Sequence, residues 1–284
     1  MTVLSNSQIV QSIIVMFINI DIFKACKDGD YEAVKKYIKK KGCVNVKDPN
    51  TGLSLLQTAC KYHGKECRFL FSKRKFDIIE LLLKNNADVN MRYRNGMTAL
   101  HILCKYYHGF HREEFINLLL AYGANVNGKD KYGRTPLHYI CYNASDNLQS
   151  AKFLVKNGAD INAIDKTGST PLHHACCQLH ISNSVARFLI EMYADASVKN
   201  NNGNTCLHYV CACGDLDVAM CLLGRVNINE KNYKGNTPLH NACENSYAIV
   251  VNTLISYGGN MNIINNNGIT PLNIAKKNNM VIGY

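Results

Sequence analysis

Apolar and polar positions alternate in blocks that recur along the whole chain. Each block holds a short apolar stretch that opens with Thr-Pro-Leu-His or a variant, and then a second apolar stretch that ends in paired aliphatic residues. A polar segment resembling Gly-Ala-x-Val-Asn follows. Apolar runs of this kind between polar, glycine- and asparagine-rich segments predict two short helices per block, with a turn-forming loop between blocks.

Glycines give this pattern its period. They stand at positions 52, 96, 133, 168, 203, 235 and 268, so that the successive spacings are 44, 37, 35, 35, 32 and 33 residues. A period near 33 residues that carries Thr-Pro-Leu-His indicates a repeat architecture in which each unit stacks on its neighbours.

The start of each first helix is well marked. The clearest copies begin at Thr135-Pro136, Thr170-Pro171 and Thr237-Pro238, and weaker ones begin at Thr98 and Thr205. Threonine is a good N-cap because its hydroxyl accepts from a free backbone N–H. Proline is tolerated next because its missing N–H would have been unpaired.

The second helices are expected to supply an apolar ridge and to end at a left-handed residue. The ridge comprises Leu81 to Leu83, Leu118 to Leu120, Phe153 to Val155, Phe188 to Ile190, Leu222 with Leu223, and Leu254 with Ile255. Gly123, Gly158 and Gly258 follow three of these helices, where a left-handed conformation favours glycine. Asn86 and Tyr193 take that place elsewhere, and Tyr193 is a departure that the pattern does not explain.

These motifs resemble those of ankyrin-repeat proteins from about Asp21 to the C-terminus. The resemblance implies an all-α solenoid of helix-turn-helix units joined by β-hairpin-like loops. We expect residues 1–20 to form an apolar leader or an extra cap helix, and residues 21–47 a degenerate N-terminal capping repeat. Residues 48–267 are expected to form six repeats, over about 48–92, 93–129, 130–164, 165–199, 200–231 and 232–264/267, and residues 268–284 an incomplete last repeat.

Histidine and cysteine are abundant enough to raise the question of a metal site. His101, His138, His173, His208 and His240 share one motif slot, however, where the family uses the imidazole in local hydrogen bonds. Cys60, Cys104, Cys141, Cys176, Cys211 and Cys243 share another, where other members have alanine and a free thiol acts as a small apolar group. We therefore assign these residues to architecture and predict no metal. Cys60, His63 and Cys67 remain the best alternative.

Composition further narrows the function. Thirteen scattered cysteines favour reduced thiols in a cytosolic or nuclear setting. The stretch Ile9 to Ile20 lacks the basic lead of a secretory signal and is too short to span a bilayer. Since no nucleotide-binding or nucleophile motif is present and the carboxylates are scattered on predicted outer faces, we predict neither an enzyme nor a cofactor or small-molecule substrate.

The predicted role is instead to bind another protein, as a monomer, through the concave side of the repeats. The net charge is +11, and residues 21–75 alone hold 14 basic against 6 acidic residues. We expect an acidic partner to contact the hairpin tips and the ends of the first helices. The residues assigned to this surface are Lys61, Tyr62, Arg94, Lys105, Tyr106, Lys131, Tyr132, Arg134 and Tyr142. Lys166, Tyr233, Lys234, Asn143, Glu244 and Asn245 occupy equivalent positions.

An insertion over residues 65–75 lengthens the first full repeat, and a shorter one follows at 107–111. The longer insertion is either a functional loop or a longer helix pair. As a basic loop with aromatic residues it would suit nucleic acid, which is a less favoured alternative because the later repeats are nearly neutral.

Irregular repeats, cysteine in the alanine slot and a Lys-, Asn- and Ile-rich composition resemble the ankyrin proteins of large poxviruses. That resemblance implies a host-range or immune-evasion factor that binds a protein in the host cytoplasm or nucleus. A cellular or bacterial-effector scaffold is the alternative. The F-box-like C-terminal segment of many such proteins is not recognisable here. The family also implies hydroxylation of hairpin asparagines, which would fall on Asn90, Asn127, Asn162, Asn229 and Asn262; a plain turn role is favoured.

Overall fold

The fold is described by a computed structural model, which covers residues 21–61, 69–107, 112–142, 147–177 and 184–283. The chain divides into two compact units, Met1–Lys131 and Tyr132–Tyr284. Each unit is a stack of helix pairs, and the two are described separately below.

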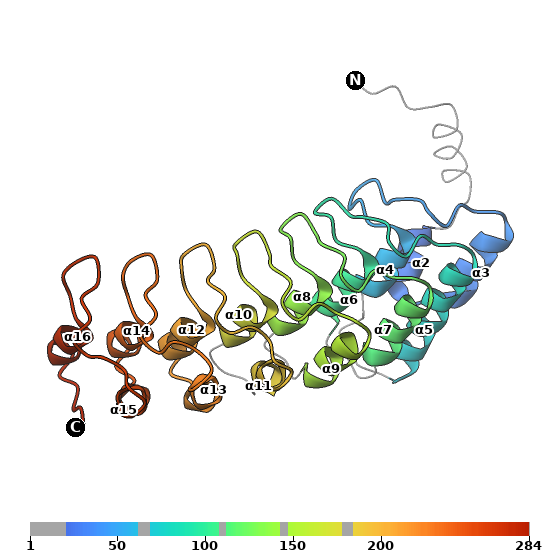
Figure 1. Ribbon diagram of the computed structural model, residues 1–284. Helices are drawn as coiled ribbons and strands as arrows, with labels where there is room; N and C mark the ends of the chain where they lie inside the picture. The colour runs from blue at the N-terminus through green and yellow to red at the C-terminus, as the bar shows by residue number, and fades with distance from the viewer. Residues whose placement is uncertain (1–20, 62–68, 108–111, 143–146, 178–183, 284) are drawn as a thin grey trace, which may run out of the picture. The chain divides into compact units, whose positions relative to one another are not determined.

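In its described residues, the first unit contains three helix pairs (Figure 1). They are α2 (Ile22–Asp28) with α3 (Tyr31–Lys39), α4 (Leu55–Lys61) with α5 (Phe69–Lys84), and α6 (Ala99–Tyr106) with α7 (Arg112–Ala121). The first helices pack in the order α2, α4, α6, and α3 packs on α5. Ile22, Val34 and Tyr37 are buried between the first two pairs, as expected of a capping unit.

The second unit repeats the arrangement four times. Its pairs are α8 (Pro136–Tyr142) with α9 (Leu148–Lys156), α10 (Pro171–Cys176) with α11 (Ser184–Glu191), α12 (Cys206–Cys213) with α13 (Leu216–Leu222), and α14 (Pro238–Glu244) with α15 (Ala248–Ser256). Helix α16 (Pro271–Lys277) then packs on α14. In Figure 1 the loops between pairs extend from one side of the first helices, and the second helices lie on the other.

Apolar burial follows the predicted ridge. One residue at the centre of each second-helix ridge has no exposed surface: Leu82, Leu119, Leu154, Leu189, Leu222 and Leu254. The six cysteines of the alanine slot are also buried. Since a helix pair cannot cover its own apolar face, these side chains make stacking the source of stability. Within the described segments, extended pairing is limited to one bridge between Lys47 and Ser54, and no helix is long and apolar enough to cross a membrane.

One hydrogen-bonded unit starts the first helices and also joins neighbouring repeats. At Thr135 the backbone N–H donates to Nδ1 of His138 at 3.1 Å, which closes the helix start. Because an N–H only donates, Nδ1 is the acceptor and the neutral ring carries its proton on Nε2. That Nε2 donates to the Ser169 carbonyl of the next repeat at 3.2 Å. His173, His208 and His240 make the same pair of bonds, which confirms the structural role predicted for this slot.

The left-handed positions also agree with the sequence pattern. Gly123, Gly158 and Gly258 have φ values of 82°, 85° and 94°, and Asn86 and Tyr193 have φ values of 63° and 60°. Tyr193 is explained by its neighbour. Arg225 of the next repeat donates from Nη1 to the Ile190 carbonyl at the end of α11, and its guanidinium carbon lies 6.0 Å from the centroid of the Tyr193 ring.

The long insertion is helical wherever the structure describes it. Helix α5 begins at Phe69, so residues 69–75 belong to a lengthened second helix, and the loop interpretation is wrong for them. Lys75 is only 2% exposed, and its ammonium donates to the carbonyls of Cys26 and Lys27 at the end of α2. Burial lowers its pKa to about 8. Lys75 therefore anchors the cap and is not available to a phosphate.

Candidate protein-binding surface

In the first unit, the predicted surface residues group around one aromatic ring. The ammonium groups of Lys61 and Lys105 lie 5.6 and 5.1 Å from the centroid of the Tyr106 ring. Both distances fall within the range of a cation–π contact. The end of α4 and the end of α6 thus present two positive charges on a shared aromatic ring.

Other predicted residues of this unit lie apart from that ring. Arg94 is exposed at its hairpin tip and reaches back over Gly52, with Nη2 3.5 Å from the Asn50 carbonyl. Lys131 is also exposed at a tip, and its backbone N–H donates to the Asn95 carbonyl at 2.9 Å. Tyr62 lies outside the described residues, as do His63, Cys67 and Asn143.

In the second unit the three predicted residues form one compact group. The guanidinium carbon of Arg134 lies 5.8 Å from the ring centroids of both Tyr132 and Tyr142. The two tyrosines are 47% and 52% exposed, whereas the Arg134 side chain is 28% exposed. The hairpin tip and the end of α8 therefore present an arginine in contact with two half-exposed aromatic rings, which we call the Tyr-Arg-Tyr cluster (Tyr132, Arg134 and Tyr142).

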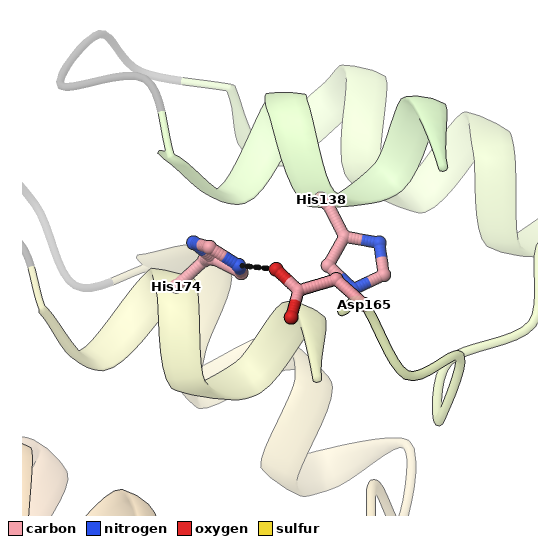
Figure 2. A group of neighbouring side chains, drawn as sticks. All are labelled: His138, Asp165 and His174. Carbon is pink, nitrogen blue, oxygen red and sulfur yellow. Dashed lines mark hydrogen bonds and ion pairs between the residues drawn. The ribbon is translucent and has the colours of Figure 1, made fainter. Parts of the chain in front are cut away.

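Sequence reasoning missed the residues beneath this cluster. Nε of Arg134 lies 3.5 Å from Oδ2 of Asp165, whose side chain is fully buried. The same oxygen accepts a 2.9 Å hydrogen bond from Nε2 of His174 on α10 (Figure 2). The expectation that carboxylates lie on outer faces is wrong for Asp165. The missed signal was a charged residue in a hairpin slot where later repeats have asparagine.

Hydrogen bonds keep Asp165 ionised despite its burial. Burial raises the pKa of its carboxyl, but hydrogen bonds from His174, Thr167 and Ser169 outweigh that effect and hold the pKa well below its usual value. A permanent negative charge thus lies under Arg134. The positive charge of Arg134 is therefore largely balanced by Asp165. It attracts a distant acidic partner less strongly than an unpaired arginine at a hairpin tip would.

Figure 2 also shows a group of three side chains, found among the described residues, whose types can bind a metal ion. One ligand atom each from His138, Asp165 and His174 lie within 4.8 Å of one another. Nε2 of His138, however, already donates to Ser169, and Nδ1 accepts from the Thr135 N–H. A metal at Nε2 would break the first bond and move the ring proton to Nδ1, where it would face the second donor.

A metal cation at this place is also disfavoured by the positive charge of Arg134, whose Nε lies 3.5 Å from Oδ2 of Asp165. Burial lowers the pKa of His138 to about 4, so this ring is neutral at physiological pH. The group is therefore best described as a buried carboxylate, Asp165, that is ion-paired with Arg134 and hydrogen-bonded to His174, and that packs against the neutral His138.

Several other basic side chains take part in joining repeats. Lys199 and Lys231 donate to the carbonyls of Lys231 and Ile264 in the following repeats, at 3.0 and 2.8 Å. In the first unit, Lys47 and Arg92 do the same toward Arg92 and Lys129. These basic side chains therefore contribute to the fold. The candidate contacts with a partner are best represented by the group around Tyr106 and by the Tyr-Arg-Tyr cluster.

The hairpin asparagines named for hydroxylation also join repeats. Asn90 donates to the Gly123 carbonyl at 2.8 Å and accepts from the Asn125 N–H at 2.9 Å. Asn229 makes the equivalent bonds to Gly258 and Asn260, and Asn162 accepts from the Asp195 N–H. These contacts support a turn role. Hydroxylation at Asn90, Asn127, Asn162, Asn229 and Asn262 stays a prediction.

Comparison with known families agrees with the architecture. Residues 69–165 and 144–232 match the model for ankyrin repeats in three copies, and residues 222–275 match a second ankyrin-repeat model of many copies. The chain belongs to the ankyrin-repeat family, with the all-α solenoid fold predicted for it. Ankyrin repeats generally mediate binding between proteins, and proteins built from them are typically non-enzymatic scaffolds.

Proposed function

We propose that this chain is a non-catalytic adaptor that binds another protein through its hairpin tips and first-helix ends, on the concave side of the repeats. The observation that carries the proposal is the Tyr-Arg-Tyr cluster. Tyrosine and arginine are the residue types most often dominant in binding energy at interfaces. Here two rings lie within 5.8 Å of the guanidinium, so that little side-chain entropy remains to be lost on binding.

The group around Tyr106 in the first unit is a second, separate candidate contact for a protein partner. It differs from the Tyr-Arg-Tyr cluster because it combines two lysines with one ring. Its charges, together with those of Arg94 and Lys131, suit an acidic partner and an association rate that falls with salt.

We further propose that the partner is a protein of a host cell, met in the cytoplasm or nucleus, and that the chain is a poxvirus-type host-range or immune-evasion factor. Support for this finer assignment comes from the composition, the irregular repeat spacings and the cysteines of the alanine slot. A cellular or bacterial scaffold is the alternative. Nucleic-acid binding is not favoured, since Lys75 of the basic stretch is buried.

The test is affinity capture from host cells, followed by measurement of the dissociation constant for the captured protein. Replacing Arg134 and Tyr142 together with alanine is expected to weaken binding at least about tenfold, because hot-spot residues typically contribute more than ~1 kcal/mol each. The matched control replaces Tyr193 and Tyr257, which are 84% and 53% exposed next to second helices.

The control variant should bind as the unchanged protein does. Equal weakening by both variants would show that exposed tyrosine in general, and not this surface, carries the interaction. Unchanged binding by the Arg134 and Tyr142 variant would refute the proposed surface. A captured partner whose affinity is insensitive to salt would refute the acidic-partner component.

A further inference from the structure

The two carboxylate oxygens of Asp165 have different structural roles. Its Oδ1 holds the hairpin, because it accepts from the backbone N–H groups of Thr167 and Ser169 at 2.8 and 3.1 Å and from the Thr167 hydroxyl at 2.6 Å. Its Oδ2 lies toward the binding surface, where it accepts from His174 and lies 3.5 Å from Nε of Arg134. Oδ1 therefore stabilises the hairpin turn, whereas Oδ2 contacts the side chains of Arg134 and His174.

Other repeats show that the turn does not require a carboxylate. Asn200 accepts from the backbone N–H groups of Asn202 and Asn204 at 2.9 and 3.1 Å through its amide oxygen. Asn232 and Asn265 accept in the same way from residues two and four positions later. A neutral amide oxygen therefore holds this hairpin three times in the same unit, and the negative charge of Asp165 is additional.

The partner of that slot differs in the same way. Nine residues after Asn200 stands Tyr209, whose hydroxyl accepts from the Asn200 amide at 2.8 Å. Nine residues after Asp165 stands His174, which donates to Oδ2. The neutral Asn200–Tyr209 pair links hairpin to helix as well as the charged Asp165–His174 pair does, so the link itself does not require the charge.

What the charged pair adds is control of the Tyr-Arg-Tyr cluster. Asp165 lies below the guanidinium, with its Oδ2 3.5 Å from Nε of Arg134 in an ion pair. The His174 ring makes an edge-to-face contact with Tyr142 at 5.9 Å, and Tyr142 in turn flanks Arg134. Asp165 thus contacts the guanidinium of Arg134, and His174 contacts Tyr142, one of the two aromatic rings beside it.

We infer that Asp165 and His174 are positioning residues, which hold Arg134 between its tyrosines as a preformed site for a carboxylate on an acidic segment of the partner. This inference rests on the proposed function. Fixing the guanidinium before binding lowers the entropy cost of association and directs its donors to one geometry, which suits a carboxylate.

Positioning and simple charge attraction predict opposite changes in affinity for an acidic ligand when Asp165 is replaced by asparagine. Asp165→Asn removes a negative charge and raises the net charge by one, so attraction alone would make an acidic ligand bind faster and tighter. Loss of positioning would instead make binding weaker, through faster dissociation. The hairpin should survive, since three neighbouring repeats already use asparagine.

The probes are acidic peptides selected on the full chain from a displayed library rich in Asp and Glu, with affinities and rates measured by biosensor. Arg134→Ala should abolish most of the binding. Asp165→Asn is expected to weaken it roughly three- to tenfold with faster dissociation, at a temperature where both proteins are folded. Asp165→Asn with His174→Tyr, which copies the Asn200–Tyr209 pair, should weaken binding equally while unfolding at nearly the temperature of the unchanged chain.

The outcomes separate the two proposals. Peptides that bind independently of Arg134, or a library that yields no binder, would overturn the proposed acidic contact and this inference with it. Binding that is lost in Arg134→Ala but unchanged or tighter in Asp165→Asn would overturn the inference alone. NMR relaxation of the Arg134 Nε–H group gives a readout without ligand: it should be rigid in the unchanged chain and mobile in Asp165→Asn, and equal mobility would refute positioning.

Discussion

The two units start their first helices in partly different ways. In the second unit a histidine in each of α8, α10, α12 and α14 closes the helix start and donates to a carbonyl of the next repeat. In the first unit His101 of α6 accepts from the Thr98 N–H in the same way, at 3.2 Å. At α4, however, Gln57 makes both bonds: its Oε1 accepts from the Ser54 N–H at 3.0 Å, and its Nε2 donates to the Met97 carbonyl at 3.2 Å. The fold requires an acceptor and a donor at fixed positions, and either an amide or an imidazole supplies them.

The difference has a consequence for pH. An amide does not titrate, whereas burial lowers the pKa of His138 and of His208 to about 4. In the unfolded chain these histidines take up protons below about pH 6.5. The folded form resists protonation until about pH 4, so stability is present above pH 6.5 and is lost progressively as the pH falls toward 4.

The largest expected effect concerns the anchor that is particular to the first unit. Lys75→Ala removes the donor to two carbonyls at the end of α2 and leaves a cavity, so it should lower the free energy of unfolding by about 3 kcal/mol. The measurement is urea denaturation. The control is Lys73→Ala on the exposed side of the same helix, with an expected change within about 0.5 kcal/mol.

A small change in the Lys75 variant would mean that the ammonium is as well solvated outside as it is paired inside. The cap would then depend on apolar packing alone. Hydrogen exchange would locate the effect: loss of protection should be greatest in α2 and α5 and should spare α12 to α15.

Exchanging histidine and glutamine at positions 208 and 57 tests how this slot affects the pH dependence of stability. His208→Gln should cost at most about 1 kcal/mol at pH 7, because glutamine makes the same bonds at position 57. Near pH 4.5 the variant should be more stable than the unchanged chain by on the order of 2 kcal/mol, since it no longer resists protonation. Urea denaturation at the two pH values measures both.

The reciprocal variant, Gln57→His, should acquire the slope that His208→Gln loses. Parallel stability curves for all three proteins between pH 7 and 4.5 would contradict the view that buried imidazoles confer acid sensitivity on this fold.

The smallest effect concerns the irregular left-handed residue of the second unit. Tyr193→Gly relieves a positive φ, a gain of about 1 kcal/mol, but loses the stack on Arg225, so the net change in unfolding free energy should lie within about 0.5 kcal/mol of zero. Tyr257→Gly is the control, because Tyr257 has a φ of −98° and glycine there offers no relief. Thermal denaturation should show Tyr257→Gly to be the less stable of the two.

Much of the architecture could be predicted because the motif residues act locally. Threonine with proline starts a helix, glycine allows a left-handed turn, and the leucines at the centres of the second-helix ridges must find neighbours. The histidine slot was likewise recognisable, since its bonds involve one helix start and the next repeat. Gln57 escaped notice because it shares the geometry of that slot and not its residue type.

The repeat, the starts of its first helices and the apolar ridge of its second helices could therefore be predicted from the sequence, because each depends on short-range steric and hydrogen-bonding preferences. The surroundings of the charged side chains, by contrast, depend on how the repeats pack together. Lys75 and Asp165 both looked like surface residues in the sequence, and their burial depends on helix ends and hairpins that come together only on stacking. Arg134 shows the same limit: its place between two tyrosines and above a carboxylate is set by three segments whose proximity no local pattern encodes.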